Sequence, residues 1–381
     1  MTIKTKKCPY SKYCGGCDYQ GIDYFEQLKI KQEKEEKLLN RFSKVKPILG
    51  CENPYNYRNK VQVSLGYNEA HELIVGNYVP SSHIIVEVDE CEICDKGANE
   101  IINSIKRLIN KYKISIFDER AYRGCLRHIL IRSTNTEEYM VVLVTGSSVI
   151  RNSEGFIRDI VKYNPKVKTI VQNINNKHTS MVLSDKNIIL YGKGYIVDEL
   201  LGLKFQVSAN SFYQVNKYQT KVLYSKAIEL AKLSGNETLI DAYCGTGTIG
   251  LLMAKHVKNV IGVEINSRAV KDAIKNSKNN KINNIEFICD DASNYMKKCA
   301  KNKTNIDVLV MDPPRAGADQ IFLNAVSKLL PNKIIYISCN PITLKENLNY
   351  LSRYYSVDTI QPVDMFPFSE HVETVVLLSI R

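Results

Sequence analysis

The second half of the chain restricts the possible folds most strongly, because short apolar runs there alternate with stretches of helical pattern. The runs are TLIDAY, NVIGVEI, IEFICD, DVLVMD, KIIYISC and HVETVVLLSI. Continuous apolar strands alternating with helices indicate a parallel, doubly wound sheet, which tolerates antiparallel strands at its end. Ligands bind such sheets outside the carboxyl ends of the strands. We therefore predict a Rossmann-like α/β domain over residues 206–381, with its site at the strand ends.

The first half of the chain has a different pattern. Residues 57–90 and 125–205 contain short β-branched and aromatic runs separated by Asn, Gly and Ser, which predicts a mainly β, largely antiparallel region. Residues 22–42 have the apolar stripe of an amphipathic helix. Since 381 residues exceed the size of one usual core, we expect three parts: a cysteine loop over 1–20, a central α+β region over 21–205 and a catalytic domain over 206–381. The helix over 22–42 could pack on the third part.

Composition indicates the class of partner and the compartment. Lys and Arg number 52 against 40 Asp and Glu, and this net charge of +12 favours a polyanion such as RNA or DNA, although a Lys-rich proteome would produce the same excess. The start of the chain has no apolar signal region, and no run of eighteen apolar residues occurs, so we expect a cytoplasmic protein without a membrane span. Eleven cysteines in a reducing compartment indicate metal binding, catalysis or burial rather than disulfides.

The first predicted strand of the catalytic domain leads into a Gly-rich turn. The sequence is TLID followed by Ala242-Tyr243-Cys244-Gly245-Thr246-Gly247-Thr248-Ile249-Gly250. Glycines let a ligand approach the backbone at a helix N-terminus, but such a turn alone also fits a dinucleotide. Acidic residues end three successive strands, at Asp241, Glu264 and Asp290-Asp291. Carboxylates suit a ribose diol, an adenine amino group and a cationic methionine better than a pyrophosphate, so we predict S-adenosylmethionine. A solvated strand end is the simpler reading of Glu264.

Two motifs at the next strand ends indicate the reaction. Asp312-Pro313-Pro314-Arg315 lacks the aromatic residue that commonly follows the two prolines in methylases of exocyclic amines. Ser338-Cys339-Asn340-Pro341 supplies a thiol, and a thiolate added to carbon 6 of a pyrimidine makes carbon 5 nucleophilic enough to accept a methyl group. A buried structural cysteine is the alternative reading of Cys339.

A base must then remove the proton from carbon 5 so that the thiol can leave. Glu373, at the start of the last apolar run, is the candidate, because desolvation at a sheet rim could raise its pKa. Glu370 and His371 are the competing bases.

Taken together, the motifs FYQVN (212–216), DAYCGTGTIG, VEIN, DPPR, SCNP and HVET resemble, in order and spacing, the RumA/TrmA family of RNA uracil-5-methyltransferases. The resemblance spans about residues 1–381. It implies a class I S-adenosylmethionine methyltransferase in which Cys339 is the nucleophile and Glu373 the base. It also implies cofactor contacts from Gln214, Tyr243, Thr248, Glu264, Asp291 and Asp312. Many members carry an N-terminal TRAM barrel, which we do not expect here because Cys8 comes almost at once.

Three cysteines near the N-terminus have the spacing C-x5-C-x2-C, at Cys8, Cys14 and Cys17. Cys91 or Cys94 could supply a fourth thiolate, and spacing alone fits either zinc or an iron–sulfur cluster. The resemblance favours a [4Fe–4S] cluster with Cys91 as the fourth ligand. Members that act on tRNA typically lack these cysteines, so the resemblance implies 23S ribosomal RNA as the substrate. A tRNA methylase and a catalytically silent RNA-binding assembly factor remain the alternatives.

The expected partner is RNA with a uridine flipped out of its stack, since carbon 5 cannot otherwise reach the enclosed thiol. Cations stand beside aromatic residues in Tyr57-Arg58-Asn59-Lys60 and along residues 126–132, a composition that suits phosphate contact and base stacking. A solvated basic face is an equally good reading of each residue alone. We infer no obligate protein partner.

Overall fold

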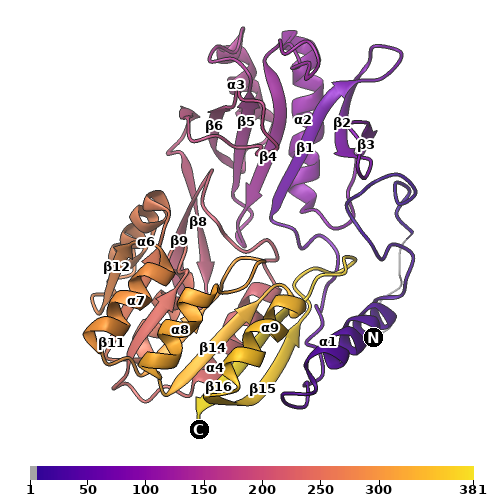
Figure 1. Cartoon of the computed structure of the whole chain (residues 1–381). Helices are drawn as coiled ribbons and strands as arrows, with labels where there is room; N and C mark the ends of the chain where they lie inside the picture. The colour runs from indigo at the N-terminus through magenta and orange to yellow at the C-terminus, as the bar shows by residue number, and fades with distance from the viewer. Residues whose placement is uncertain (1–6) are drawn as a thin grey trace.

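In the computed structural model, which describes residues 7–381, two seven-stranded sheets organise the chain. The sheet of the C-terminal half has the order β12-β11-β10-β13-β14-β16-β15 (Figure 1). Its strands are β10 (Thr238–Ala242), β11 (Asn259–Glu264), β12 (Ile285–Cys289), β13 (Val308–Met311), β14 (Lys333–Ser338), β15 (Tyr355–Val363) and β16 (Glu373–Ile380). The first five are parallel, whereas β16 runs antiparallel to both β14 and β15. This order confirms the predicted doubly wound α/β fold with antiparallel strands at its end.

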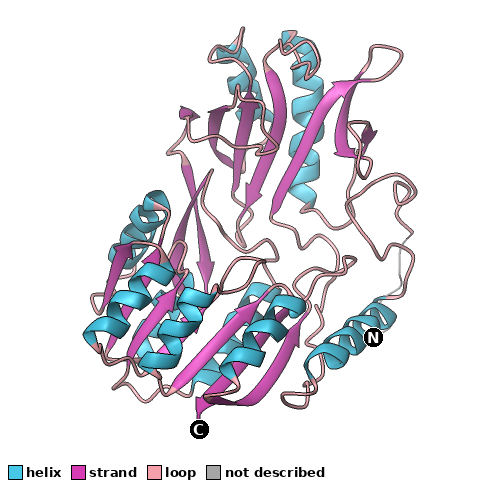
Figure 2. Ribbon diagram, in the orientation of Figure 1, coloured by secondary structure: helices cyan, strands magenta, loops and turns pink. Residues whose placement is uncertain are grey.

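Helices cover both faces of this sheet (Figure 2). They are α4 (Gln219–Ala231), α5 (Thr248–Met253), the 3-10 turn η1 (Ala254–His256), α6 (Ser267–Asn279), α7 (Ala292–Asn302), α8 (Gln320–Leu329) and α9 (Pro341–Leu351). Alternate residues of β13 enter different cores: Val308 and Val310 join one apolar cluster, and Leu309 and Met311 join another. Burial of both faces explains why these strands are apolar throughout.

The second sheet has the order β3-β2-β1-β4-β5-β6-β7 and is antiparallel except between β5 and β6. Its strands are β1 (Lys60–Tyr67), β2 (Leu73–Tyr78), β3 (Ile85–Glu87), β4 (Leu126–Ser133), β5 (Tyr139–Thr145), β6 (Val167–Ile174) and β7 (Asn187–Tyr191). Helices α2 (Lys96–Tyr112) and α3 (Ser153–Tyr163) pack together beside it. The hairpin of β8 (Tyr195–Leu200) and β9 (Leu203–Ser208) connects the two halves, and one apolar cluster runs from β4 and β5 through β9 to α4.

The first helix, α1 (Tyr24–Leu39), lies beside the C-terminal sheet rather than the first one (Figure 1). It packs against α9 and β15. The chain that follows continues along β15, where Val45 bridges Ile360 and Leu49 bridges Val363. Residues 24–49 therefore extend the edge of the catalytic half. Across residues 7–381, no helix combines the length and the apolar character that crossing a bilayer requires.

Candidate active site

One cavity of about 550 Å³ lies at the carboxyl ends of the parallel strands. Strands β10 to β14 each end at its wall, while Glu373 enters from the start of β16 and Gln214 from the segment after β9. All eight residues predicted to bind the cofactor or to react line this cavity: Gln214, Tyr243, Thr248, Glu264, Asp291, Asp312, Cys339 and Glu373. The carboxyl ends of five strands, together with Gln214 and Glu373 from two other segments, therefore bring together residues that are spread over 160 positions of the sequence.

The turn between β10 and α5 forms the floor of the cavity. Tyr243 and Gly245 have φ angles of +66° and +55°, in the left-handed region. A Cβ added to Gly245 would have no protein atom within 4 Å, so this backbone borders open cavity space that a ligand can approach. Asp241 is fully buried and accepts the N–H of Gly250 at 2.8 Å, so it stabilises the turn rather than lining the cavity.

Two of the acidic strand ends are held in place by backbone N–H groups. Glu264 accepts the N–H of Gly245 at 3.0 Å and that of Asn266 at 2.7 Å. Asp291 caps α7 by accepting the N–H of Asn294 at 2.9 Å. Ionised carboxylates only accept hydrogen bonds and keep spare acceptor capacity, so these side chains can receive hydroxyl and amino donors from a nucleoside. The carboxylates, the open glycine backbone and the cavity volume fit S-adenosylmethionine.

Three titratable groups lie close together in the cavity: Asp312, Cys339 and Glu373. Burial raises the pKa of Asp312 to about 7. Burial, followed by the charges of Asp312 and Glu35, raises the pKa of Glu373 well above its usual range. Burial and then the charges of Glu373 and Asp312 raise the pKa of Cys339 to about 11, against the opposing effect of Arg315. The thiol is therefore protonated in the free protein at neutral pH, and its activation depends on neighbouring charges.

The two competing bases occupy different positions from Glu373. Glu370 is exposed and forms an ion pair with Lys34 at 3.3 Å. His371 accepts a hydrogen bond from Arg315 at its Nδ1, at 3.2 Å, outside the set of residues that line the cavity. Glu373 has only 4% of its surface exposed, and it lines the cavity together with Cys339.

The cavity wall also contains residues to which sequence analysis gave no role. Phe212 has 68% of its surface exposed and lines the cavity, as does Tyr224, which is buried in α4. Phe212 could have been singled out, since an aromatic residue in a loop two positions from a predicted cofactor contact suits base stacking. Tyr224 carries no such signal, because in the sequence it matches the apolar face of a helix.

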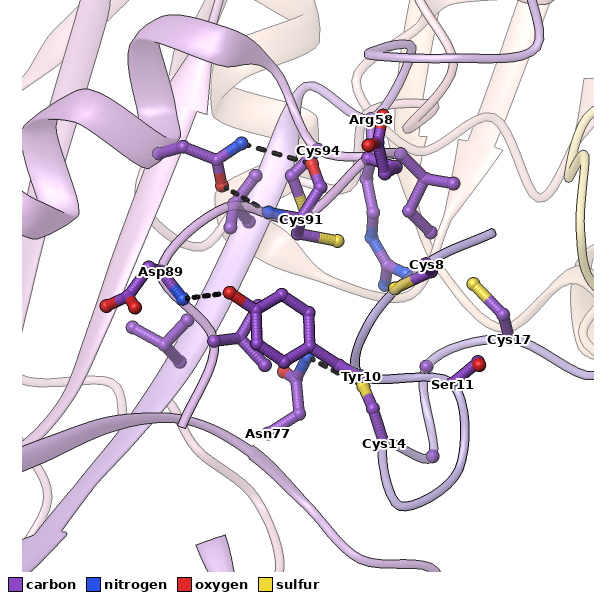
Figure 3. A pocket seen from close by; sticks show the side chains of 18 of the residues that line it. Cys8, Tyr10, Ser11, Cys14, Cys17, Arg58, Asn77, Asp89, Cys91 and Cys94 are labelled. Carbon is purple, nitrogen blue, oxygen red and sulfur yellow. Dashed lines mark hydrogen bonds between the residues drawn. The ribbon is translucent and has the colours of Figure 1, made fainter. Parts of the chain in front are cut away.

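The predicted cysteine ligands line a second pocket of about 380 Å³. Figure 3 shows Cys8, Cys14 and Cys17, all from the N-terminal loop, facing Cys91 across this pocket. The backbone of Cys91 is fixed by Asn99, which accepts its N–H at 3.3 Å and donates to its carbonyl at 3.1 Å. Cys94 also lines the pocket. Within residues 7–381, no three His, Cys, Asp or Glu side chains are grouped so that they could hold a single metal ion.

Comparison with known proteins identifies the family. The family described as tRNA (Uracil-5-)-methyltransferase matches residues 23–381. RNA methyltransferases from Halalkalibacterium halodurans and Staphylococcus aureus strain MSSA476 are 42% and 39% identical to this chain, over 98% of it and 83% and 84% of their own lengths.

A solved structure has the same fold. The Pyrococcus abyssi tRNA (uracil-54, C5)-methyltransferase, in complex with S-adenosyl-L-homocysteine, has a TM-score of 0.81 and 28% identity, over 96% of this chain and 86% of that one. The chain therefore belongs to the tRNA (uracil-5-)-methyltransferase family of S-adenosylmethionine-dependent RNA methyltransferases.

Proposed function

We propose that this enzyme methylates carbon 5 of a uridine in 23S ribosomal RNA, with Cys339 as the nucleophile and Glu373 as the base. The observation that carries the proposal is the shared cavity: the Cys339 thiol and the buried Glu373 carboxylate line it together with all six predicted cofactor contacts. A cytoplasmic location is consistent with this substrate.

Each side chain has a separate task in the proposed reaction. The Cys339 thiolate adds to carbon 6 of the uracil, which turns carbon 5 into an enolate-like nucleophile. When bound, S-adenosylmethionine supplies the electrophilic methyl group that carbon 5 takes up, and S-adenosylhomocysteine is the leaving group. The Glu373 carboxylate then accepts the proton from carbon 5, and the bond between carbon 6 and the Cys339 sulfur breaks to release the thiolate.

Arg315 and Asp312 change the pKa values of the Cys339 thiol and the Glu373 carboxyl, respectively. The guanidinium of Arg315 lowers the pKa of the thiol, so it favours the attacking thiolate. The carboxylate of Asp312 raises the pKa of Glu373, which makes that residue a stronger base. Both residues line the cavity.

The same proposal assigns a [4Fe–4S] cluster to Cys8, Cys14, Cys17 and Cys91. A zinc ion with Zn–S bonds of about 2.3 Å would bring four sulfurs to within about 4 Å of one another, which is a tighter group than a cluster needs, because each cluster thiolate binds a different iron. Four cysteines line a pocket of about 380 Å³, and this wide arrangement supports the cluster rather than a single zinc ion. When bound, the cluster would cross-link the N-terminal loop to the turn between β3 and α2 that contains Cys91.

A tRNA is the second candidate substrate, favoured by the activity of the Pyrococcus abyssi protein. Mass mapping of ribosomal and transfer RNA from cells with and without the gene separates the two candidates. We expect loss of a 5-methyluridine from 23S ribosomal RNA and an unchanged tRNA pool. Loss from tRNA alone would move the substrate to tRNA, and loss of a methyl group at another atom would contradict the chemistry.

A further inference from the structure

Helix α1 turns an unusual face toward the catalytic half, because the buried stripe of this helix is largely polar. Its inward residues repeat every three or four positions, the spacing of one helix face, and each is at most 2% exposed: Tyr24, Gln27, Lys31, Glu35 and Leu39. Charged side chains are almost never fully buried unless they are paired. The partners of this stripe therefore indicate what the helix does.

Those partners lie mostly in one segment, residues 364–374, which leads to Glu373. Lys31 forms an ion pair with Asp364 at 2.6 Å and donates to the carbonyl of Phe366 at 3.0 Å. Gln27 accepts the N–H of Phe368 at 2.9 Å. The helix thus holds the segment that precedes the proposed base at several successive points.

Glu35 is the last polar residue of this buried stripe, and its hydrogen bonding differs from that of Gln27 and Lys31. Its Oε2 accepts the hydroxyl of Thr374 at 2.8 Å, while its Oε1 is buried without a hydrogen-bond partner. Thr374 follows Glu373 directly, and neighbouring strand residues point to opposite faces of a sheet. The Oε2 of Glu373 is also buried without a partner. Two incompletely hydrogen-bonded carboxyl groups therefore flank the start of β16, one from the cavity side and one from α1.

We propose that Glu35 is a positioning residue for the carboxylate of Glu373: its hydrogen bond to Thr374 fixes the start of β16, and its negative charge strengthens Glu373 as a base. This inference rests on the proposed role of Glu373 in removing the proton from carbon 5. Glu35 itself is outside the cavity and has no direct contact with the reacting atoms.

The charges around both groups determine the expected pH dependence. Burial raises the pKa of Glu35 to about 7, while the Thr374 hydroxyl and the charge of Lys34 oppose that rise. Glu373 faces Asp312 from the end of β13, Cys339 from the end of β14, Tyr224 from α4 and Glu35 from α1. The nearby cation, Arg315, acts on Cys339. Glu35 is therefore ionised above about pH 7, and its charge then raises the pKa of Glu373 further.

The direction of the expected pH shift follows from these charges. Only ionised Glu373 can accept a proton, so proton removal from carbon 5 accelerates as the pH rises through the pKa of Glu373. Removing the charge of Glu35 lowers that pKa, and the midpoint of the acceleration must move to lower pH. A purely structural role for Glu35 would reduce the rate at every pH and leave the midpoint in place.

The test uses single-turnover release of tritium from [5-³H]uridine-labelled total RNA, taken from cells that lack the gene, between pH 6 and pH 10. We expect Glu35→Gln, which can still accept the Thr374 hydroxyl, to shift the midpoint to lower pH. Glu33→Gln removes a carboxylate from the exposed side of the same helix and should match the wild type. An unshifted midpoint in Glu35→Gln would overturn the inference.

Two further measurements keep the result decisive. If Glu35→Gln fails to bind S-adenosylhomocysteine with wild-type affinity, Thr374→Val replaces it. Loss of the hydroxyl raises the pKa of Glu35 and so extends the pH range in which this group is neutral, which should shift the midpoint downward as well; a wild-type midpoint overturns the inference. Failure of Glu373→Gln to stop tritium release would instead contradict the proposed base itself, so the two failures can be told apart.

Discussion

Lys31 and Asp364 form an ion pair of 2.6 Å in which both side chains are completely buried, although 333 positions separate them in the sequence. Burial lowers the pKa of Lys31, and the charge of Asp364 opposes that effect. We predict that Lys31→Met lowers the free energy of unfolding by about 3–5 kcal/mol, because it leaves a buried carboxylate without its cation. Urea denaturation followed by circular dichroism measures this loss. The control is Arg268→Gln, which breaks the exposed ion pair with Asp185 and should lower the free energy of unfolding by only about 0–1 kcal/mol. An equal loss in the two variants would contradict this prediction.

The Gly-rich turn between β10 and α5, which lines the cavity, gives a second prediction. Gly245→Ala places a methyl group in open cavity space and strains a backbone with φ of +55°. We expect the affinity for S-adenosylhomocysteine to fall by about tenfold or more, and stability to fall by about 1–2 kcal/mol. Gly202→Ala is the matched control, since Gly202 has φ of +78° and also no atom near an added Cβ, but lies in the β8–β9 turn. Calorimetric titration should show normal binding for Gly202→Ala; normal binding by Gly245→Ala would remove this turn from the cofactor site.

Much of the catalytic half could be predicted because its signals are local. Each apolar run became a strand of the C-terminal sheet, and the strand-end rule placed Glu264, Asp312 and Cys339 on one cavity. The same reasoning could have found α2, where Ile101, Ile105 and Leu108 repeat at helical spacing, but that helix was not predicted.

The inner face of α1 could not be predicted in the same way. Lys31 and Glu35 look like solvated charges in the sequence, and only partners more than 330 positions away make their burial possible. The sequence therefore predicts an apolar stripe for the helix over 22–42, whereas the structure buries a largely polar one. Such pairing depends on the tertiary arrangement, for which the local pattern carries no signal.

The environment of Cys339 predicts how its reactivity depends on pH. With a pKa of about 11, its alkylation by iodoacetamide should be slow at pH 7.5 and rise steadily as the pH increases toward that value. Asp312→Asn removes a negative charge, lowers the pKa and should accelerate alkylation at pH 8, whereas Arg315→Met should slow it. Peptide mass spectrometry follows each cysteine separately, and the exposed Cys289 serves as the internal reference. Identical rates in all three proteins would contradict the assigned charge effects.

The cysteine pocket predicts a coloured protein. Anaerobically purified enzyme should be brown and contain about four irons per chain. Replacement of Cys8, Cys14, Cys17 or Cys91 by Ser should remove the colour, whereas Cys94→Ser should retain it. Loss of a ligand should also weaken RNA binding more than S-adenosylhomocysteine binding, because the two pockets share no residues. A colourless preparation with one zinc per chain would contradict the cluster.

The covalent bond between Cys339 and the substrate tests the central claim most directly. Glu373→Gln is incubated with S-adenosylmethionine and total RNA from cells that lack the gene, and nuclease- and protease-treated adducts are analysed by mass spectrometry. The proposed chemistry predicts a 5-methyl-5,6-dihydrouridine joined through carbon 6 to the peptide that contains Cys339, and no adduct in the Cys339→Ala/Glu373→Gln double variant. An adduct on another cysteine, or continued methylation of RNA by Cys339→Ala, would contradict the assignment of the nucleophile.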